Sequence, residues 1–140
     1  MRYALRNGMT IGAHSAGHPN MTLLTEDQVR FQMDQTNLYL NRTLGIVPRF
    51  FRFPYGATDD SLDRIVKEEY GMTSVFWSTL TGDSNEPSAT PEEQVDIYKR
   101  FNQTSKDIIL MHDTHERLVT GVNVLKQILN GECNGSQSKF

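Results

Sequence analysis

Cysteine is almost absent from this sequence, and so are the patterns of several protein classes. The 140 residues include one cysteine, Cys133, which excludes an internal disulfide and a cysteine-rich zinc site. No apolar run is long enough to cross a bilayer, so we expect no membrane span. Basic residues are not in excess, because 14 Lys and Arg stand against 17 Asp and Glu. The net charge of −3 argues against a nucleic-acid partner, whose phosphates need a basic face.

A leader sequence is also missing from the first residues. MRYALRNG carries charge at once and has no apolar core, so it is not a signal peptide. It reads instead as the last turns of a helix that ends near Gly8, and we therefore expect the chain, as given, to start inside a domain. The composition is that of a globular protein, with 37% hydrophobic and 22% charged residues. We expect one domain over residues 1–131 and a flexible tail over 132–140.

Four Asn-x-Ser/Thr sequons permit N-glycosylation if the protein is secreted. Such short motifs also arise by chance, so they indicate secretion only weakly. They begin at Asn20, Asn41, Asn102 and Asn134.

Strand and helix patterns alternate four times along the chain. This alternation predicts an α/β fold with a parallel sheet or a β/α barrel. Polar capping residues mark two helix starts, Thr25 with Gln28 and Thr90 with Glu93, and Gly45 marks a helix end. The expected strands cover 9–14, 49–53, 72–77 and 106–112, and we expect the last to be buried on both faces. The expected helices cover 25–44, 60–69, 90–101 and 117–130. In the last helix, the residues expected to face inward are Leu118, Val122, Leu125 and Leu129.

Candidate site residues follow each expected strand. In parallel α/β folds, chemistry gathers at the carboxyl ends of the strands. We therefore expect these segments to share one face, and they indicate a site. They are His14 with His18, Pro54-Tyr55-Gly56, Thr79 to Asp83, and His112 with Asp113.

The pair His14 and His18 has two interpretations. Neutral imidazoles are common zinc ligands, and a spacing of four lets both rings face one point if the turn between them is helical. Taken alone, two solvated histidines in a first helical turn is the better interpretation. A metalloprotease H-E-x-x-H motif is excluded, because Ser15 stands where the glutamate must be.

His112 also has two interpretations. It is either a core histidine satisfied by a backbone carbonyl or a general acid held by its strand. Asp113 beside it either orients the ring or caps the loop, and His115 reads as a surface residue.

Three further residues are weighed in the same way. Arg52 lies in the apolar strand FFRFP, where it forms a structural ion pair or orients a catalytic carboxylate. Trp77 belongs to the core or lines a sugar groove. Asp83 is expected to face solvent by default.

Together these residues resemble the NodB-type polysaccharide deacetylases, which include chitin and peptidoglycan deacetylases. Three of the five family motifs are intact and in order: H-[ST]-x-x-H at His14–His18, R-x-P-x-G at Arg52–Gly56 and L-x-H at Leu110–His112. The fourth motif, D-x-x-D-W, keeps only Asp83, with Ser84 in place of the tryptophan. The resemblance extends to about residue 131.

The first motif, T-F-D-D, is not in the chain. In the family it supplies the catalytic base and the third metal ligand. Asp59-Asp60 is a possible substitute, but its position at the start of an expected helix favours a capping role.

The resemblance implies a metal-dependent hydrolase that removes N-acetyl groups from N-acetylglucosamine polymers such as chitin. It implies a divalent metal on His14 and His18, zinc or alternatively cobalt. It implies an incomplete, distorted β/α barrel without its first strand, and an extracellular or cell-wall location. In the implied mechanism, the Tyr55 N–H donates a hydrogen bond to the oxyanion and Arg52 orients the base. His112 donates a proton, and Asp83 belongs to the same catalytic set. The implied substrate contacts are Tyr55, Trp77 and Leu110.

Two alternatives stay open beside an N-deacetylase. One is a catalytically inactive relative that acts as a carbohydrate-binding or structural module. The degraded fourth motif and the missing first motif favour it for this chain, whereas the surviving His14, His18, Arg52 and His112 favour an enzyme. The other is an unrelated β/α domain with chance motifs.

Overall fold

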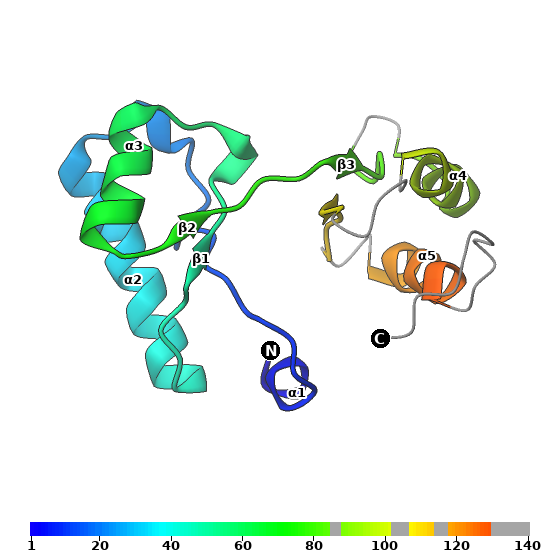
Figure 1. Cartoon of the computed structure of the whole chain (residues 1–140), viewed down its shortest axis with the longest axis horizontal. Coiled ribbons are helices and arrows are strands. Elements are labelled where there is room, and N and C mark those ends of the chain that lie inside the picture. Colours follow the sequence, from blue (N-terminus) through cyan, green and yellow to red (C-terminus); the bar gives the residue numbers. More distant parts are fainter. Residues whose placement is uncertain (85–87, 102–106, 114–117, 130–140) are drawn as a thin grey trace. The chain divides into compact units, whose positions relative to one another are not determined.

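A computed structural model describes residues 1–84, 88–101, 107–113 and 118–129. The chain divides into two compact units, Met1–Phe76 and Trp77–Phe140, and each is described by itself. Both combine short parallel strands with helices, as the alternating pattern predicts (Figure 1). Within the described residues, no helix has both the length and the apolar character that a membrane crossing requires.

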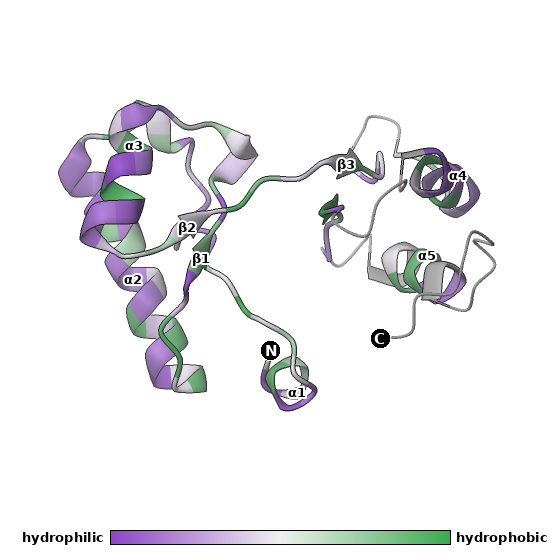
Figure 2. Cartoon of the chain, in the orientation of Figure 1, coloured by the Kyte–Doolittle hydropathy of each residue, from purple (hydrophilic) through white to green (hydrophobic). Residues whose placement is uncertain are grey.

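The first unit, Met1–Phe76, is built around the long helix α2. This helix spans Glu26–Leu44 and has the predicted capping box, in which Thr25 and Gln28 exchange side-chain and backbone hydrogen bonds. Gly45 ends it in the left-handed conformation at φ 70°. The predicted helix is therefore confirmed at both ends, and Figure 2 shows hydrophilic and hydrophobic residues along its whole length.

The other helices of the first unit are short. The helix α1 spans Arg2–Arg6, and the 3-10 turns η1 and η2 span Met21–Leu23 and Pro54–Gly56. The helix α3 spans Asp60–Arg64 and continues as a π-helix, η3, over Ile65–Glu69.

The residue before α3 is its cap. The Asp59 carboxylate accepts a hydrogen bond from the Leu62 N–H at 2.9 Å. This confirms the capping role for Asp59, whereas Asp60 is the first residue of the helix itself.

The strands of the first unit are shorter than predicted. Strand β1 is Phe50–Phe51 and strand β2 is Thr73–Ser74, and the two pair in parallel. Pro54 has no N–H, which helps to end pairing soon after β1. Of the strand expected over 9–14, only Ala13 pairs, through an isolated parallel bridge to Phe51.

An apolar core holds these elements together. Phe51 and Phe53 are fully buried and meet edge to face, with ring centroids 4.9 Å apart. Outside the core, the Arg30 guanidinium bonds both Glu26 and Glu69, which ties α2 to the end of η3. These hydrogen bonds and the positive charge lower the pKa of both carboxyls below the usual value. The core residues are Ala13, Met21, Val29, Met33, Leu40, Phe51, Phe53, Leu62, Ile65, Val66 and Met72.

The second unit, Trp77–Phe140, also contains one parallel strand pair. Strands β3 (Thr79–Leu80) and β4 (Ile109–Leu110) lie side by side, and α4 (Pro91–Phe101) contacts α5 (Leu118–Leu129). The capping box that opens α4 is confirmed, because Thr90 and Glu93 exchange hydrogen bonds at 2.8 and 3.3 Å.

Three expectations for the second unit are wrong. Strand β4 is half-buried and not covered on both faces, and strand β3 occupies Thr79–Leu80, which were expected to follow the third strand and not to form one. Between residues 121 and 127 of α5, where burial is described, Val124 is buried, whereas Val122 and Leu125, which were expected to face inward, are exposed. Burial of Leu118 and Leu129 and the 132–140 tail lie outside the described residues. In the described part of the chain, the strands form two separate pairs and no closed barrel.

Candidate active site

The bridge at Ala13 places His14 at the end of a strand-like segment. The Ala13 N–H donates to the Phe50 carbonyl at 2.8 Å, and the Arg52 N–H donates to the Ala13 carbonyl at 2.9 Å. His14 is the next residue, so the parallel pairing sets where it leaves the sheet. This agrees with the expectation that site residues follow the strands.

The segment between the two histidines is a strained loop and not a helical turn. Ser15 and His18 have φ values of 62° and 53°, in the left-handed region that non-glycine residues rarely adopt. The His18 N–H donates to the Ser15 hydroxyl at 3.0 Å. The loop brings the His14 and His18 rings into an edge-to-face contact with centroids 4.8 Å apart. The two histidines therefore meet, but a loop and not a helix brings them together.

The backbone of Arg52 sets the tautomer of His14. Nδ1 of His14 lies 2.7 Å from the Arg52 carbonyl oxygen, which can only accept. Nδ1 must therefore carry the proton, and a neutral His14 keeps a lone pair on Nε2. Metal-binding histidines are commonly oriented in this way by a carbonyl on the other nitrogen. Both His14 and His18 are exposed, as ligands open to an incoming ion must be.

Tyr55 lies against His18. Its backbone is left-handed at φ 61°, and its ring contacts the His18 ring edge to face at 4.8 Å. Pro54 and Gly56 complete the turn, and Gly56 is itself left-handed at φ 67°. Among the described residues, the Tyr55 N–H has no hydrogen-bond acceptor. This N–H group can therefore donate a hydrogen bond to a bound molecule beside the two histidines.

Arg52 is only half-buried, which corrects the expectation of a buried arginine. Its side-chain Nε donates to the Val75 carbonyl at 3.3 Å. The hydrogen bond links β1 to the segment that follows β2. Through its carbonyl, the same residue orients His14, which gives Arg52 a role that its side chain did not suggest.

In the second unit, Asp83 holds His112. Nδ1 of His112 lies 3.1 and 3.2 Å from the two carboxylate oxygens of Asp83, and the His112 N–H donates to the same group. A carboxylate accepts, so Nδ1 carries the proton and Nε2 is the atom left to exchange one. The Asp83 side chain is 7% exposed, whereas the His112 side chain is 35% exposed.

Three expectations around His112 need correction. Asp83 is buried and does not face solvent, because it accepts hydrogen bonds from a residue 29 positions later. Asp113 is exposed, and the residue that orients the His112 ring is Asp83. The partner of the ring is therefore a carboxylate and not the expected carbonyl. His115 lies outside the described residues.

Trp77 and Leu110, the predicted substrate contacts, are both half-buried. The Leu110 carbonyl accepts a hydrogen bond from the buried Thr81 hydroxyl at 3.1 Å. Their contact with substrate stays a prediction.

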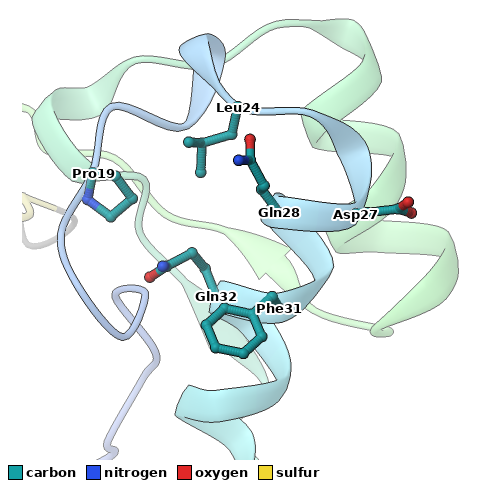
Figure 3. A pocket seen from close by; sticks show the side chains of 6 residues that line it. All are labelled: Pro19, Leu24, Asp27, Gln28, Phe31 and Gln32. Atoms are coloured by element: carbon teal, nitrogen blue, oxygen red, sulfur yellow. The ribbon is translucent and has the colours of Figure 1, made fainter.

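An open cavity of about 390 Å³ lies beside the histidine loop (Figure 3). Pro19, the residue after His18, forms one wall, and the first turns of α2 form the other. The sequence did not indicate this cavity. Its lining residues are Pro19, Leu24, Asp27, Gln28, Phe31 and Gln32.

The donor set suits a divalent transition metal but is incomplete. Within residues 1–84, 88–101, 107–113 and 118–129, no three His, Cys, Asp or Glu side chains are grouped closely enough to hold an ion. His14 and His18 supply two imidazoles in contact, one of them with a fixed tautomer. Nitrogen ligands of this kind fit zinc or cobalt.

Comparison with known proteins shows which family has this set of residues. The polysaccharide deacetylase family profile matches residues 1–75, which include His14, His18 and the Arg52–Gly56 turn. The chain belongs to the polysaccharide deacetylase family. Chitin deacetylase 1 of Saccharomyces cerevisiae is 28% identical in an alignment of 134 residues that covers 93% of this chain and 44% of the yeast protein. The chain thus spans less than half the length of the curated relatives it matches.

Solved structures of the family share the fold. A family 4 carbohydrate esterase from Streptomyces lividans, in complex with acetate, has a TM-score of 0.78 and 31% identity, covering 94% of this chain and 66% of that one. A CE4 family pseudoenzyme from Bacillus anthracis has a TM-score of 0.76 at 23% identity, covering 92% and 44%, and shows the fold alone. The fold is therefore that of CE4 deacetylases, a family that is generally metal-dependent.

Proposed function

We propose that this chain is part of a metal-dependent enzyme that removes N-acetyl groups from N-acetylglucosamine polymers such as chitin. Membership of the polysaccharide deacetylase family supports this reaction class. The observation that carries the proposal is the hydrogen bond from Nδ1 of His14 to the Arg52 carbonyl, which leaves Nε2 as a ligand beside His18. Two solvated histidines would need neither the fixed tautomer of His14 nor the contact between the two rings.

His14 and His18 would hold the ion, zinc or alternatively cobalt. When bound, such an ion supplies a Lewis acid that polarises water and carbonyl oxygen. The third ligand and the base are proposed to come from the family motif T-F-D-D, which these 140 residues do not include. The two parallel strand pairs would then be parts of a distorted β/α barrel that is incomplete here without its first strand.

The remaining roles follow from the donors that each residue has available. The Tyr55 N–H donates to the oxyanion that forms as the amide carbon becomes tetrahedral. The Arg52 guanidinium orients the carboxylate base. Nε2 of His112 first takes up a proton and then gives it to the leaving amine, while the Asp83 carboxylate keeps Nδ1 protonated and holds the ring in place. Trp77 and Leu110, together with the Tyr55 ring, contact the sugar chain.

The proposed location is outside the cell or in the cell wall, where such polymers lie. The four sequons are consistent with secretion. Among the relatives, the yeast chitin deacetylase is named for chitin, and we take chitin as the first substrate to test.

A second function, a non-catalytic carbohydrate-binding or structural module, has its own support. Ser84 replaces the tryptophan of the fourth motif, and the described residues hold no third metal ligand near the histidines. The two functions differ in whether acetate is released.

Acetate release from an acetylated chito-oligosaccharide, followed by mass spectrometry with zinc present, tests the proposal. We expect none from the 140-residue chain and release from a longer form that carries the Asp-Asp segment. A peptidoglycan fragment serves as the second substrate. A longer form that binds either polymer but releases no acetate would favour the non-catalytic module.

Zinc binding by the 140-residue chain gives an independent test. Two imidazoles without an anionic ligand should bind weakly, and calorimetric titration measures the affinity. Tight binding of one zinc per chain would show that another residue completes the site, with Asp59 and Asp113 the first to examine.

A further inference from the structure

Gln32 of α2 reaches back to the histidine loop. Its side-chain oxygen, Oε1, accepts two hydrogen bonds, from the Ala16 N–H at 3.1 Å and from the Gly17 N–H at 2.8 Å. These two residues lie between the candidate ligands His14 and His18. Nothing in the sequence motif points to Gln32, which stands 14 residues after the second histidine.

The geometry of the loop explains why a single oxygen can serve both donors. Ser15 is left-handed, so the N–H groups of the next two residues converge on one point, and converging N–H groups form a site for an acceptor. An amide oxygen has two lone pairs and can satisfy both. Without this oxygen, the N–H groups of Ala16 and Gly17 would lose their acceptor, and the strained loop would lose its hydrogen bonds to α2.

The anchor itself stands on a rigid element. Gln32 is half-buried on α2, next to the fully buried Met33 and one turn after the fully buried Val29. The capping box at Thr25 fixes the first turn of the same helix. A polar group on a well-packed helix holds its partners more tightly than one on a loop does.

Gln32 has a different task from the neighbouring glutamine of the cavity. The side-chain oxygen of Gln28 accepts the Thr25 N–H and belongs to the helix cap. In Figure 3 the Gln32 side chain lies on the cavity wall between Phe31 and Pro19, on the side of the histidine loop. Gln32 therefore ties the helix to the loop, whereas Gln28 ties the helix to its own start.

We propose that Gln32 is a positioning residue for the metal site: its amide oxygen holds the loop in the conformation in which His14 and His18 can share one divalent ion. The proposal rests on the proposed function, because it takes the two histidines as ligands. Gln32 acts through the backbone and touches neither the ion nor the substrate.

The test compares three variants of the full 140-residue chain. Gln32→Leu removes the acceptor at nearly constant size in a good helix former, and Gln32→Glu keeps an oxygen acceptor. Gln35→Leu is the matched control, because Gln35 is an exposed residue of the same helix. Far-UV circular dichroism and thermal melts establish that each variant folds, and Gln32→Ala replaces Gln32→Leu if that variant does not.

Two signals are measured by NMR. The first is hydrogen exchange of the Ala16 and Gly17 amides, which we expect to accelerate at least about tenfold in Gln32→Leu and to stay slow in Gln32→Glu and Gln35→Leu. The second is the shift of the His14 and His18 ring protons during titration with zinc. Loss of a residue that orients metal ligands typically weakens affinity by about 10- to 100-fold, and we expect a loss of that size in Gln32→Leu with recovery in Gln32→Glu.

The outcomes separate this proposal from the proposed function. If the unaltered chain binds zinc at both histidines and Gln32→Leu binds it equally well, the positioning role is overturned and the metal site stands. An equal loss in Gln35→Leu would also overturn it, because the effect would then belong to the helix as a whole. If neither ring responds to zinc in the unaltered chain, the metal site fails, and the role of Gln32 toward it fails with it.

Discussion

The two units of this chain bury different kinds of residue. The core of the first unit is entirely apolar and includes the fully buried Phe51 and Phe53. In the described part of the second unit, Val95 and Val124 are buried together with several polar side chains. These are Thr79, Thr81, Asp83 and Gln94.

The candidate site residues in the two units are held in correspondingly different ways. In the first unit, the backbone positions the two histidines. It does so through the bridge at Ala13, the left-handed conformations of Ser15 and His18, and the carbonyl that accepts a hydrogen bond from His14. In the second unit, one buried carboxylate, Asp83, holds His112 at both its N–H and its ring. The family profile matches residues 1–75, almost the whole first unit. The comparison teaches that a short strained loop can bring two candidate ligands into contact, whereas His112 is held by the side chain of a buried residue.

The largest expected effect separates the chemistry of the two units. In an active, longer form of the protein, His112→Ala should lower the deacetylation rate by roughly 10²- to 10⁴-fold, because a positioned general acid is lost. Bound metal should stay at about one per chain in elemental analysis, since His112 is not a ligand. His14→Ala should lower rate and metal together.

Asp96→Asn is the control for His112→Ala, because Asp96 is an exposed residue of the same unit. If His112→Ala strips the metal as His14→Ala does, the division between ligand and acid is wrong. If it changes neither rate nor metal content, His112 is a structural histidine.

The next effect concerns the cores. Phe51→Ala should lower the free energy of unfolding of the first unit by about 3 to 5 kcal/mol, because it removes a buried aromatic side chain. Val124→Ala in the second unit should cost about 1.5 kcal/mol for the smaller group removed.

Trp77, the single tryptophan, reports on the second unit by fluorescence during denaturation, and amide exchange in α2 reports on the first. Phe51→Ala should move mainly the α2 signal. Equal movement of the Trp77 transition would show that the units unfold as one, and the comparison of separate cores would not hold.

A smaller effect compares the two capping boxes. Thr25→Ala and Thr90→Ala should each cost about 1 kcal/mol, because each removes the acceptor for an N–H in the first helical turn. Amide exchange in α2 and in α4 measures the two losses. Glu93→Gln keeps the box and removes the charge, so it should cost only a few tenths of a kcal/mol at low salt. A loss for Thr90→Ala felt in α2 would contradict the separation of the units.

The smallest effect is the pH dependence of the first unit. Hydrogen bonds from Arg30, and its positive charge, lower the pKa of Glu26 and Glu69 below the ordinary value of 4.5. Their contribution to stability is therefore present above pH 4.5 and is lost as the pH falls through the lowered values. Arg30→Met should raise both pKa values and flatten this acid dependence, which NMR titration of the carboxyl carbons measures. Lys67→Met, an exposed control, should leave both pKa values as they are.

The ends of the capped helices could be predicted from the sequence, and the structure has them at the predicted residues. Helix α2 begins after Thr25 and ends at Gly45, because capping and apolar spacing act within a few residues. The capping box at Thr90 is correct for the same reason. Strand lengths were overestimated, because a strand exists only where a partner pairs with it, and Ala13 is the single paired residue of the segment 9–14.

The motif residues themselves were determined by the sequence alone: His14, His18, the Arg52–Gly56 turn and His112 are chemical types at fixed spacings, and they were enough to indicate the family. Tertiary structure decided what holds them. Asp83 was expected in solvent and is buried against His112, and Gln32 was not noticed although it binds the histidine loop. Each partner lies far from its histidine or loop along the chain, and hydrogen bonds over such separations depend on how the backbone folds back, which no local pattern encodes.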